Sequence, residues 1–182
     1  MPRPRSLTSG GRPPLRVAVI VSRYNASITD KLLEGARNTF QVQCPRGKLD
    51  VIQAPGSFEL PALALAAAQS GLYQGVAALG CLIKGETSHD RVIADAVAHG
   101  LVQATIATGV PITFGVLTVD TPEQAQARAG GDRGNKGADA MTALLETIAA
   151  IERMNDQTAQ ETRKLVLAVK PDKAARKHRS SR

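Results

Sequence analysis

The chain has 182 residues, of which 43% are apolar, enough to bury the core of one domain, so disorder throughout is excluded. No window approaches the roughly 18 uncharged apolar residues of a membrane span, and residues 1–16 carry four arginines and four prolines without the hydrophobic run of a secretory signal. Two cysteines, Cys44 and Cys81, are too few for a disulfide framework and lack the close pairing typical of zinc sites. We therefore expect a cytoplasmic protein with reduced thiols.

The formal net charge of +7 is unevenly distributed. Residues 1–16 carry four arginines and no acid, and residues 162–182 carry eight lysines or arginines against one acid, whereas residues 17–161 carry 11 basic and 15 acidic residues. The sequence thus predicts a mildly acidic body with two basic ends. Neither end has an aromatic residue to stack on a base, so any polyanion would be held electrostatically. We expect solvated ends, with nucleic-acid contact as the less favoured alternative.

Strand and helix patterns alternate along the first half of the body. A continuous β-branched apolar run over residues 15–21 predicts a strand covered on both faces. A helix ending near residue 40 and a shorter strand over residues 49–54 follow. Ser57 is placed to cap an alanine- and leucine-rich helix that ends at Gly71.

The alternation continues through the second half. The expected elements are a buried strand over residues 75–83, a helix over 88–108, a strand over 111–119, a short helix to 128 and a last helix ending near 154. Thr121-Pro122-Glu123-Gln124 has the composition of a capping box with proline in the first helical turn. The glycine-rich residues 130–137 interrupt the chain before the last helix.

Such alternation with short connections predicts a parallel sheet with helices on both faces. In such sheets, ligands bind beyond the carboxyl ends of the strands. This rule directs attention to residues 22–25, 55–59 and 84–89, and to the region after the fourth strand.

The segment KGETSH over residues 84–89 is the most informative of these strand ends. Together with an upstream glycine it has the spacing of a P-loop, but Glu86 stands where the lysine must be, which excludes a nucleotide triphosphatase. The turn into Thr87 and Ser88 still offers backbone N–H groups and hydroxyls to a phosphate monoester, unless it is only an ordinary capped helix start. His89 lies at the positive end of the helix dipole, which favours an uncharged ring that could act as a base; a structural role is the alternative.

Aromatic residues are scarce, and two of the five, Tyr24 and Phe58, fall at predicted strand ends. They could stack on a planar ligand or simply pack. Asn25 and Glu59 lie at the same edge, with helix capping as the structural alternative to ligand binding.

Arg128 and Lys136 flank the glycine-rich interruption. A cation near a helix end is favourable to the dipole, so both could be structural. Their functional interpretation is a clamp on an anion, for which the planar guanidinium of Arg128 is better suited.

Four ordered blocks resemble the 6,7-dimethyl-8-ribityllumazine synthase family. The blocks are SRYN (22–25), APGSFELP (54–61), LGCLIKGETSH (79–89) and FGVLTVDTPEQAQARAGGDRGNKG (114–137). The resemblance covers residues 15–154 and neither basic end. It implies a flavodoxin-like α/β/α sandwich with a four-stranded parallel sheet, and a homopentamer or larger assembly with active sites between subunits. We expect a domain over residues 15–156 between flexible basic ends, 1–14 and 157–182.

The resemblance also implies an activity. The family joins 5-amino-6-ribitylaminouracil to 3,4-dihydroxy-2-butanone 4-phosphate, giving 6,7-dimethyl-8-ribityllumazine, phosphate and water in riboflavin biosynthesis, without a cofactor or metal. A flavin-binding relative with weakened catalysis is the alternative.

The resemblance further assigns roles to residues. Tyr24 would stack on the pyrimidine ring, where the family usually has Phe or Trp, residues 57–59 would hold the ribityl chain, residues 85–87 with Arg128 would take the phosphate, and His89 would move protons. The implied substrate-binding set is Tyr24, Asn25, Gly56, Ser57, Phe58, Glu59, Cys81, Leu82, Ile83, Gly85, Glu86, Thr87, Phe114, Arg128 and Lys136.

Three of these residues, Phe114, Arg128 and Lys136, reach the site from the neighbouring subunit in the family. This fits the position of Phe114, which lies well inside the fourth predicted strand. One departure from the family pattern stands out. After the histidine the family commonly has an aromatic residue and then an acid, whereas this chain has Asp90 and Arg91. An acid at position 90 could make the histidine more basic or repel phosphate.

Overall fold

The computed structural model describes residues 14–168. The chain divides into two compact units, Met1–Glu146 and Thr147–Arg182. The elements in chain order are β1 (Arg16–Ser22), α1 (Ala26–Gln43), β2 (Lys48–Ala54), α2 (Leu60–Gln69), β3 (Gly75–Ile83), α3 (His89–Thr108), β4 (Ile112–Val119), α4 (Pro122–Arg128), β5 (Ala129–Gly131), β6 (Gly134–Asn135) and α5 (Lys136–Ala168).

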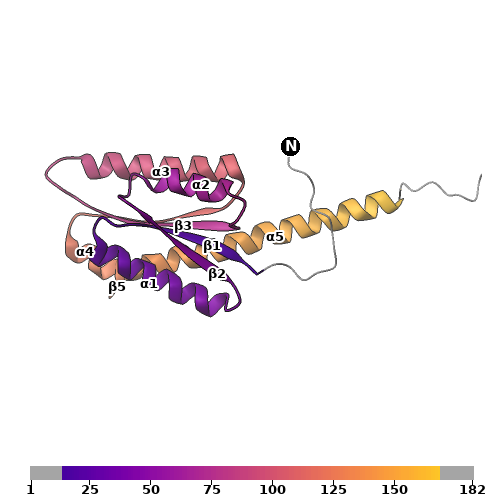
Figure 1. The fold of residues 1–182 in the computed structure, drawn as a ribbon, viewed down its shortest axis with the longest axis horizontal. Coiled ribbons are helices and arrows are strands. Elements are labelled where there is room, and N and C mark those ends of the chain that lie inside the picture. Colours follow the sequence, from indigo (N-terminus) through magenta and orange to yellow (C-terminus); the bar gives the residue numbers. More distant parts are fainter. Residues whose placement is uncertain (1–13, 169–182) are drawn as a thin grey trace, which may run out of the picture. The chain divides into compact units, whose positions relative to one another are not determined.

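The first unit is built on the predicted four-stranded parallel sheet, in the order β2-β1-β3-β4, with helices on both faces (Figure 1). Residues 17–22 of β1 are all buried because β1 lies inside the sheet and is covered on both faces. The register pairs Ser22 with Ala54 and Ile83 with Val119. The carboxyl ends of the strands therefore meet at one edge, where the site-forming loops begin.

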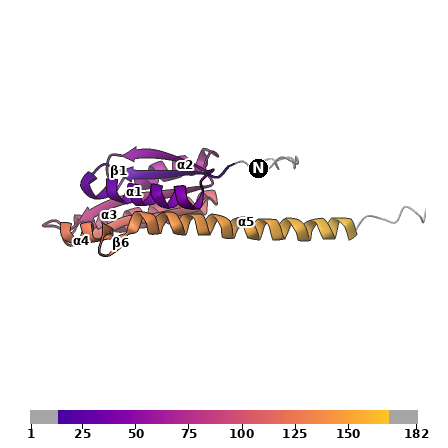
Figure 2. The same ribbon diagram turned by 90° about the horizontal axis from the view of Figure 1, so that it is seen from below.

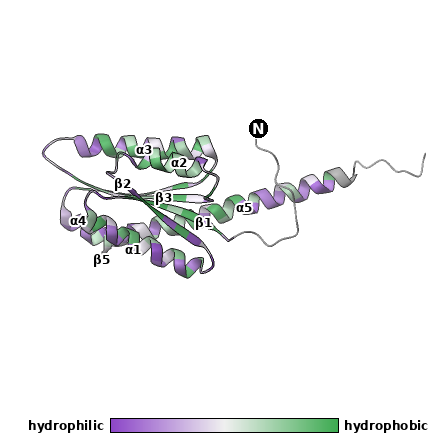
Figure 3. Ribbon diagram, in the orientation of Figure 1, coloured by the Kyte–Doolittle hydropathy of each residue, from purple (hydrophilic) through white to green (hydrophobic). Residues whose placement is uncertain are grey.

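Side chains that alternate along β1 supply two separate cores. Ala18 and Ile20 belong to a buried cluster with residues of α2 and α3. On the other face, α1 and the first turns of α5 lie side by side (Figure 2), so closely that a side chain at Gly137 would collide with the backbone of Leu32. Hydrophobic residues follow the central strands and the inner sides of the helices (Figure 3).

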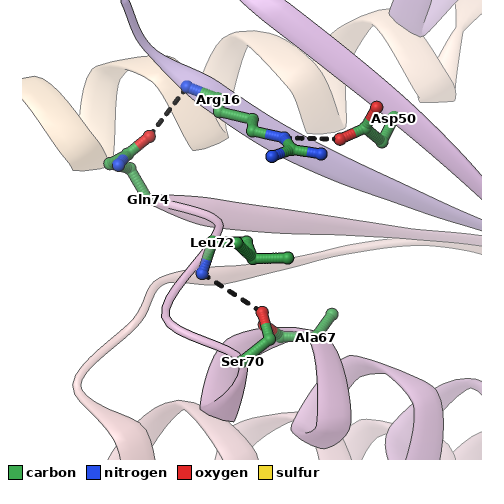
Figure 4. Close-up of polar contacts among 6 residues, drawn as sticks. All are labelled: Arg16, Asp50, Ala67, Ser70, Leu72 and Gln74. Atoms are coloured by element: carbon green, nitrogen blue, oxygen red, sulfur yellow. Dashed lines mark hydrogen bonds and ion pairs between the residues drawn. The ribbon is translucent and has the colours of Figure 1, made fainter. Parts of the chain in front are cut away.

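The amino-terminal edge of the sheet is held by contacts around Arg16 (Figure 4). The backbone N–H of Arg16 donates to Gln74 Oε1 at 2.7 Å, and its Nε donates to Asp50 Oδ2 at 2.6 Å. The guanidinium also lies 5.3 Å from the centre of the Tyr73 ring. The guanidinium of Arg16 lowers the pKa of the Asp50 carboxyl through this hydrogen bond. These contacts join β1, β2 and the start of β3 at the edge opposite the loops of the candidate site.

The predicted cap on α2 is wrong. The helix begins at Leu60 after Glu59, and no side-chain hydrogen bond caps it. Residues 57–60 instead form a turn in which the N–H of Leu60 donates to the carbonyl of Ser57 at 3.2 Å. This turn keeps the Ser57 side chain out of reach of the helix end.

The predicted capping box of α4 is present in altered form. Thr121 Oγ1 accepts from the N–H of Gln124 at 3.3 Å, as expected. Gln124 Oε1, however, accepts from the N–H of Asp120 at 3.0 Å, one residue before the cap. The helix start is therefore anchored one residue earlier than the usual pattern.

The glycine-rich residues 130–137 form more structure than the expected interruption. Gly130 and Gly134 take positive φ angles of 108° and 76°, which let β5 and β6 form a small antiparallel hairpin. Asn135 then caps α5, since its Oδ1 accepts from the N–H groups of Gly137 and Ala138. Its Nδ2 donates to the carbonyl of Lys31 at 2.8 Å, which ties the hairpin to α1.

Helix α5 ends at Ala168, beyond the predicted end near residue 154, so residues 157–168 are helical. The second unit contributes the helical residues from Thr147 onward, and residues 153–165 are exposed. The basic segments 1–13 and 169–182 lie outside the described residues, so the predicted flexibility of the ends stays a prediction there. Within residues 14–168, no helix is both long and apolar enough to cross a membrane.

Candidate functional site

A cavity of about 370 Å³ opens at the carboxyl edge of the sheet, in the first unit. Its lining residues are Tyr24, Asn25, Gly56, Ser57, Phe58, Glu59, Cys81, Leu82, Ile83, Gly85, Thr87, His89, Asp90 and Ile93. They come from three loops that follow β1, β2 and β3 and from the start of α3. Every predicted site residue is present except Glu86, Phe114, Arg128 and Lys136. A larger hollow of about 610 Å³ beside α1 and α4 contains no residue of the predicted set.

Two aromatic side chains line the cavity and remain exposed. Tyr24, after β1, is 69% exposed, and Phe58, after β2, is 60% exposed. A ring buried in the core would be far less accessible, so neither ring packs in the core of its own chain. Both rings are therefore available to stack on a planar ligand.

Asn25 shapes the loop that carries Tyr24. It is the one described residue other than glycine with a positive φ, 59°, a left-handed conformation that asparagine tolerates better than most residues. Its side chain does not cap α1. Instead, Asn25 Nδ2 donates to the carbonyl of Cys81 at 2.9 Å, and the N–H of Tyr24 donates to Ser22 Oγ at 3.2 Å. The side chain of Asn25 is thus used to join the ends of β1 and β3.

The Cys81 side chain is buried in the cavity wall. Burial raises the pKa of its thiol to about 11. The thiol is therefore protonated near neutral pH, and because the thiolate is the nucleophilic form, Cys81 is a wall residue rather than a nucleophile.

The loop after β2 brings Ser57 and Glu59 to the cavity. Ser57 is 5% exposed, and its Oγ has no hydrogen-bond partner in the described structure. It fits against β3 because Gly80 has no side chain; a Cβ there would lie 2.7 Å from Ser57 Oγ. A Cβ at Gly56 would likewise lie 3.0 Å from Glu59 Oε2. The two glycines thus leave room for the polar groups of Ser57 and Glu59.

His89 is the first residue of α3 and is exposed at the cavity. Its N–H donates weakly to Thr87 Oγ1 at 3.4 Å, and Ser88 makes no side-chain cap. The ring itself makes no hydrogen bond within the described residues, whereas His99 Nδ1 contacts the carbonyl of Asp95 at 2.9 Å. Of the two histidines in residues 14–168, His89 is the one that lines the cavity, and its ring is free to exchange a proton with a bound molecule.

Asp90 and Ile93 line the cavity although neither was in the predicted set. Ile93 could have been predicted from helical spacing, since it lies one turn beyond His89 on α3. Asp90 Oδ1 is buried and has no hydrogen-bond partner. No hydrogen bond or ion pair joins it to His89 in the described part of the chain.

The remaining predicted residues lie elsewhere on the chain. Glu86 is exposed and does not line the cavity. Phe114 pairs with Ala78 in the sheet, five residues and roughly 16 Å before the end of β4, and is 45% exposed. Arg128 ends α4 in a separate hollow, and Lys136 Nζ forms an ion pair with Asp139 at 3.0 Å. One subunit alone does not bring these cations and this ring to the cavity.

The geometry defines a class of protein: a flavodoxin-like α/β fold with a ligand site at the carboxyl edge of its parallel sheet. The family model for 6,7-dimethyl-8-ribityllumazine synthase matches residues 14–152, and the chain belongs to this family, whose reaction is a step of riboflavin biosynthesis. The expected fold and the resemblance are thereby confirmed.

Three relatives carry the family name. 6,7-Dimethyl-8-ribityllumazine synthase 1 of Caulobacter vibrioides is 44% identical over 79% of this chain and 94% of its own length. The synthases of Nitratidesulfovibrio vulgaris and Xanthomonas oryzae pv. oryzae are 43% and 46% identical, over 77% and 78% of this chain and 90% and 93% of their own lengths. The relatives are thus matched over nearly their whole length.

Proposed function

We propose that this protein condenses 5-amino-6-ribitylaminouracil with 3,4-dihydroxy-2-butanone 4-phosphate to form 6,7-dimethyl-8-ribityllumazine, phosphate and water. One observation carries the proposal. Residues from three separate strand ends, which the family resemblance assigns to substrate binding, converge on one cavity of about 370 Å³. A cavity of this size, with mixed aromatic and polar walls, suits small metabolites.

The proposed binding mode follows from the positions of the walls. The exposed rings of Tyr24 and Phe58 offer stacking surfaces to the pyrimidine ring. Glu59, whose carboxylate is not used to cap α2, offers acceptor oxygens to the ribityl chain. The loop over residues 85–87 lies beside the amino end of α3, where backbone N–H groups favour a phosphate.

The chemistry requires little of the protein beyond positioning. The ring amine forms a Schiff base with the ketone and releases water, and elimination then releases phosphate. The ribitylamino nitrogen closes the ring on the carbonyl formed by tautomerisation, which releases a second water and completes the product. The reacting groups belong to the substrates, so the cavity acts mainly by holding them together. His89, whose ring is free, serves as the proton-transfer group.

The proposed active site is completed by a second copy of the chain. Three features support an assembly, and we propose a homopentamer or a multiple of it. Phe114, on the edge strand β4, and Arg128 are exposed away from their own chain's cavity. Val92, Val102 and Ile106 of α3 are 62%, 57% and 71% exposed. Exposed apolar side chains grouped on one helix are typical of a surface that another chain covers. We further propose that the enzyme acts in the cytoplasm.

The test is direct. Purified full-length protein mixed with both substrates should produce lumazine fluorescence well above the uncatalysed rate, and light scattering should give a mass that is a multiple of five chains. Tight binding of lumazine or riboflavin without turnover would instead support the alternative, a flavin-binding relative with weakened catalysis. A monomer in solution would reject the shared site.

A further inference from the structure

Asp90 is a charged residue of the cavity wall whose buried oxygen has no partner. It is the second residue of α3 and lines the cavity next to His89. Its Oδ1 is inaccessible to solvent and makes no hydrogen bond. Buried polar atoms in folded proteins are nearly always paired, so each exception calls for an explanation.

The fold alone does not supply this explanation. A carboxylate in the first turn of a helix is favourable to the dipole, but that effect is available to an exposed side chain and does not require burial. Asp90 is not the cap of α3, which is Ser88. The neighbouring Arg91 is exposed and forms no ion pair with Asp90 in the described part of the chain, and Lys84, on the preceding loop, lies 3.9 Å from Asp120. Within the described residues, Asp90 therefore has no hydrogen bond or ion pair that would compensate for the burial of its oxygen.

The surroundings of Asp90 point to a ligand. The other unpartnered buried oxygen of the cavity wall is Ser57 Oγ, on the loop after β2. An ionised carboxylate can only accept hydrogen bonds, whereas a hydroxyl can donate or accept. The cavity thus offers polar positions to a molecule rich in N–H and O–H groups.

We infer that Asp90 is a specificity-determining residue that accepts a hydrogen bond from an N–H or O–H group of the non-phosphorylated substrate. The inference rests on the proposed function. The ribitylaminouracil carries ring N–H groups, amines and several hydroxyls, whereas the phosphorylated ketone carries one free hydroxyl and no N–H group. Asp90 thereby favours the substrate that carries the donors.

The test compares Asp90→Ala and Asp90→Asn with the wild type, and uses Asp95→Ala as the matched control because Asp95 is an exposed acid of the same helix outside the cavity. Each KM is measured with the other substrate saturating. Removal of a charged acceptor should raise the KM for the pyrimidine about 10-fold or more and leave kcat and the KM for the ketone within about 2-fold. Asp90→Asn, which keeps an acceptor oxygen, should show a smaller rise, and the control none. Equal changes in both KM values, or no change, would overturn the inference.

Two further measurements separate the possible outcomes. The first repeats the comparison with a diaminopyrimidinedione that lacks the ribityl chain. If Asp90→Ala no longer raises the KM for this pyrimidine, the donor is a ribityl hydroxyl. If the KM still rises, the donor is on the ring or its amines. Lumazine binding, followed by its fluorescence, reports on the cavity without turnover. If the wild type does not turn over but Asp90→Ala still weakens lumazine binding about 10-fold, the proposed reaction fails and the binding role stands. If light scattering shows that both Asp90 variants lose the native mass, Asp90 is an assembly residue and the inference is overturned.

Discussion

Asn25 Nδ2 donates a hydrogen bond to the backbone carbonyl of Cys81, 2.9 Å away, and so joins the ends of two neighbouring strands. Asn25 follows β1 in a left-handed conformation, and Cys81 lies near the end of β3. The bond holds the loop that presents Tyr24 against the end of β3. One side chain thus links backbone geometry to the position of an exposed ring.

Replacement of this donor tests that link. Asn25→Asp tolerates the left-handed backbone but cannot donate to the carbonyl, so we expect a loss of about 1 kcal/mol in the free energy of unfolding and a several-fold rise in the KM for the pyrimidine substrate. Urea unfolding and steady-state kinetics measure the two effects. Asn25→Gly, which keeps the backbone and also loses the bond, is the companion variant; wild-type kinetics in both would refute the positioning role.

His89 is expected to contribute to rate more than to binding. His89→Ala should lower kcat roughly 10²-fold while substrate KM values change little, because proton transfer is lost but both binding walls remain. Residual activity should persist, since the substrates supply the reacting groups. His99→Ala is the control, because the His99 ring is already engaged with the carbonyl of Asp95. An unchanged kcat in His89→Ala would remove its proposed role.

Asp50 should make stability depend on pH. Arg16 lowers the pKa of Asp50 in the folded chain, so its contribution is present above the unfolded pKa and is lost as pH falls through the folded pKa. The effect should be about 1 kcal/mol, because both side chains remain partly exposed, 32% for Arg16 and 27% for Asp50. Urea unfolding of the wild type and Asp50→Asn at pH 7 and pH 3 measures it. The difference between the two proteins should be largest at pH 7 and smaller at pH 3; a constant difference would contradict this assignment.

The strands and the cavity walls were predictable because their signals are local. Continuous apolar runs mark β1 and β3, and the rule on carboxyl ends places the residues that follow each strand at one edge. The hairpin of β5 and β6 was not predictable, because glycines permit many conformations and the bond from Asn135 to Lys31, a tertiary contact, selects one. The burial of Asp90 Oδ1 was not predictable either, because it also depends on tertiary packing, and residue spacing does not indicate which side-chain oxygen is buried.

The extent of α5 shows a further limit. Residues 153–165 are exposed, so no periodic apolar face marks where the helix ends. The cap on α2 failed for a related reason, because Ser57 has the right residue type but the turn over residues 57–60 aims it at β3. Residue type and spacing identify candidates, and the path of the backbone decides which contact forms.

The proposed site combines residues of two subunits, and this can be tested with variants. Within one chain His89 lines the cavity while Arg128 lies in a separate hollow beside Glu123 and Arg133. Arg128→Ala alone should raise the KM for the phosphorylated ketone far more than that for the pyrimidine, since its guanidinium is proposed to hold the phosphate.

Co-expression of His89→Ala and Arg128→Ala chains then separates a shared site from one built within a chain. In mixed assemblies, about a quarter of the sites should combine an intact His89 from one chain with an intact Arg128 from its neighbour, so activity should rise well above that of either variant alone. Arg133→Ala, another arginine of the same hollow, is the control for general loss of charge. If mixed assemblies of verified composition are no more active than the separate variants, both residues act within one chain and the shared site is wrong.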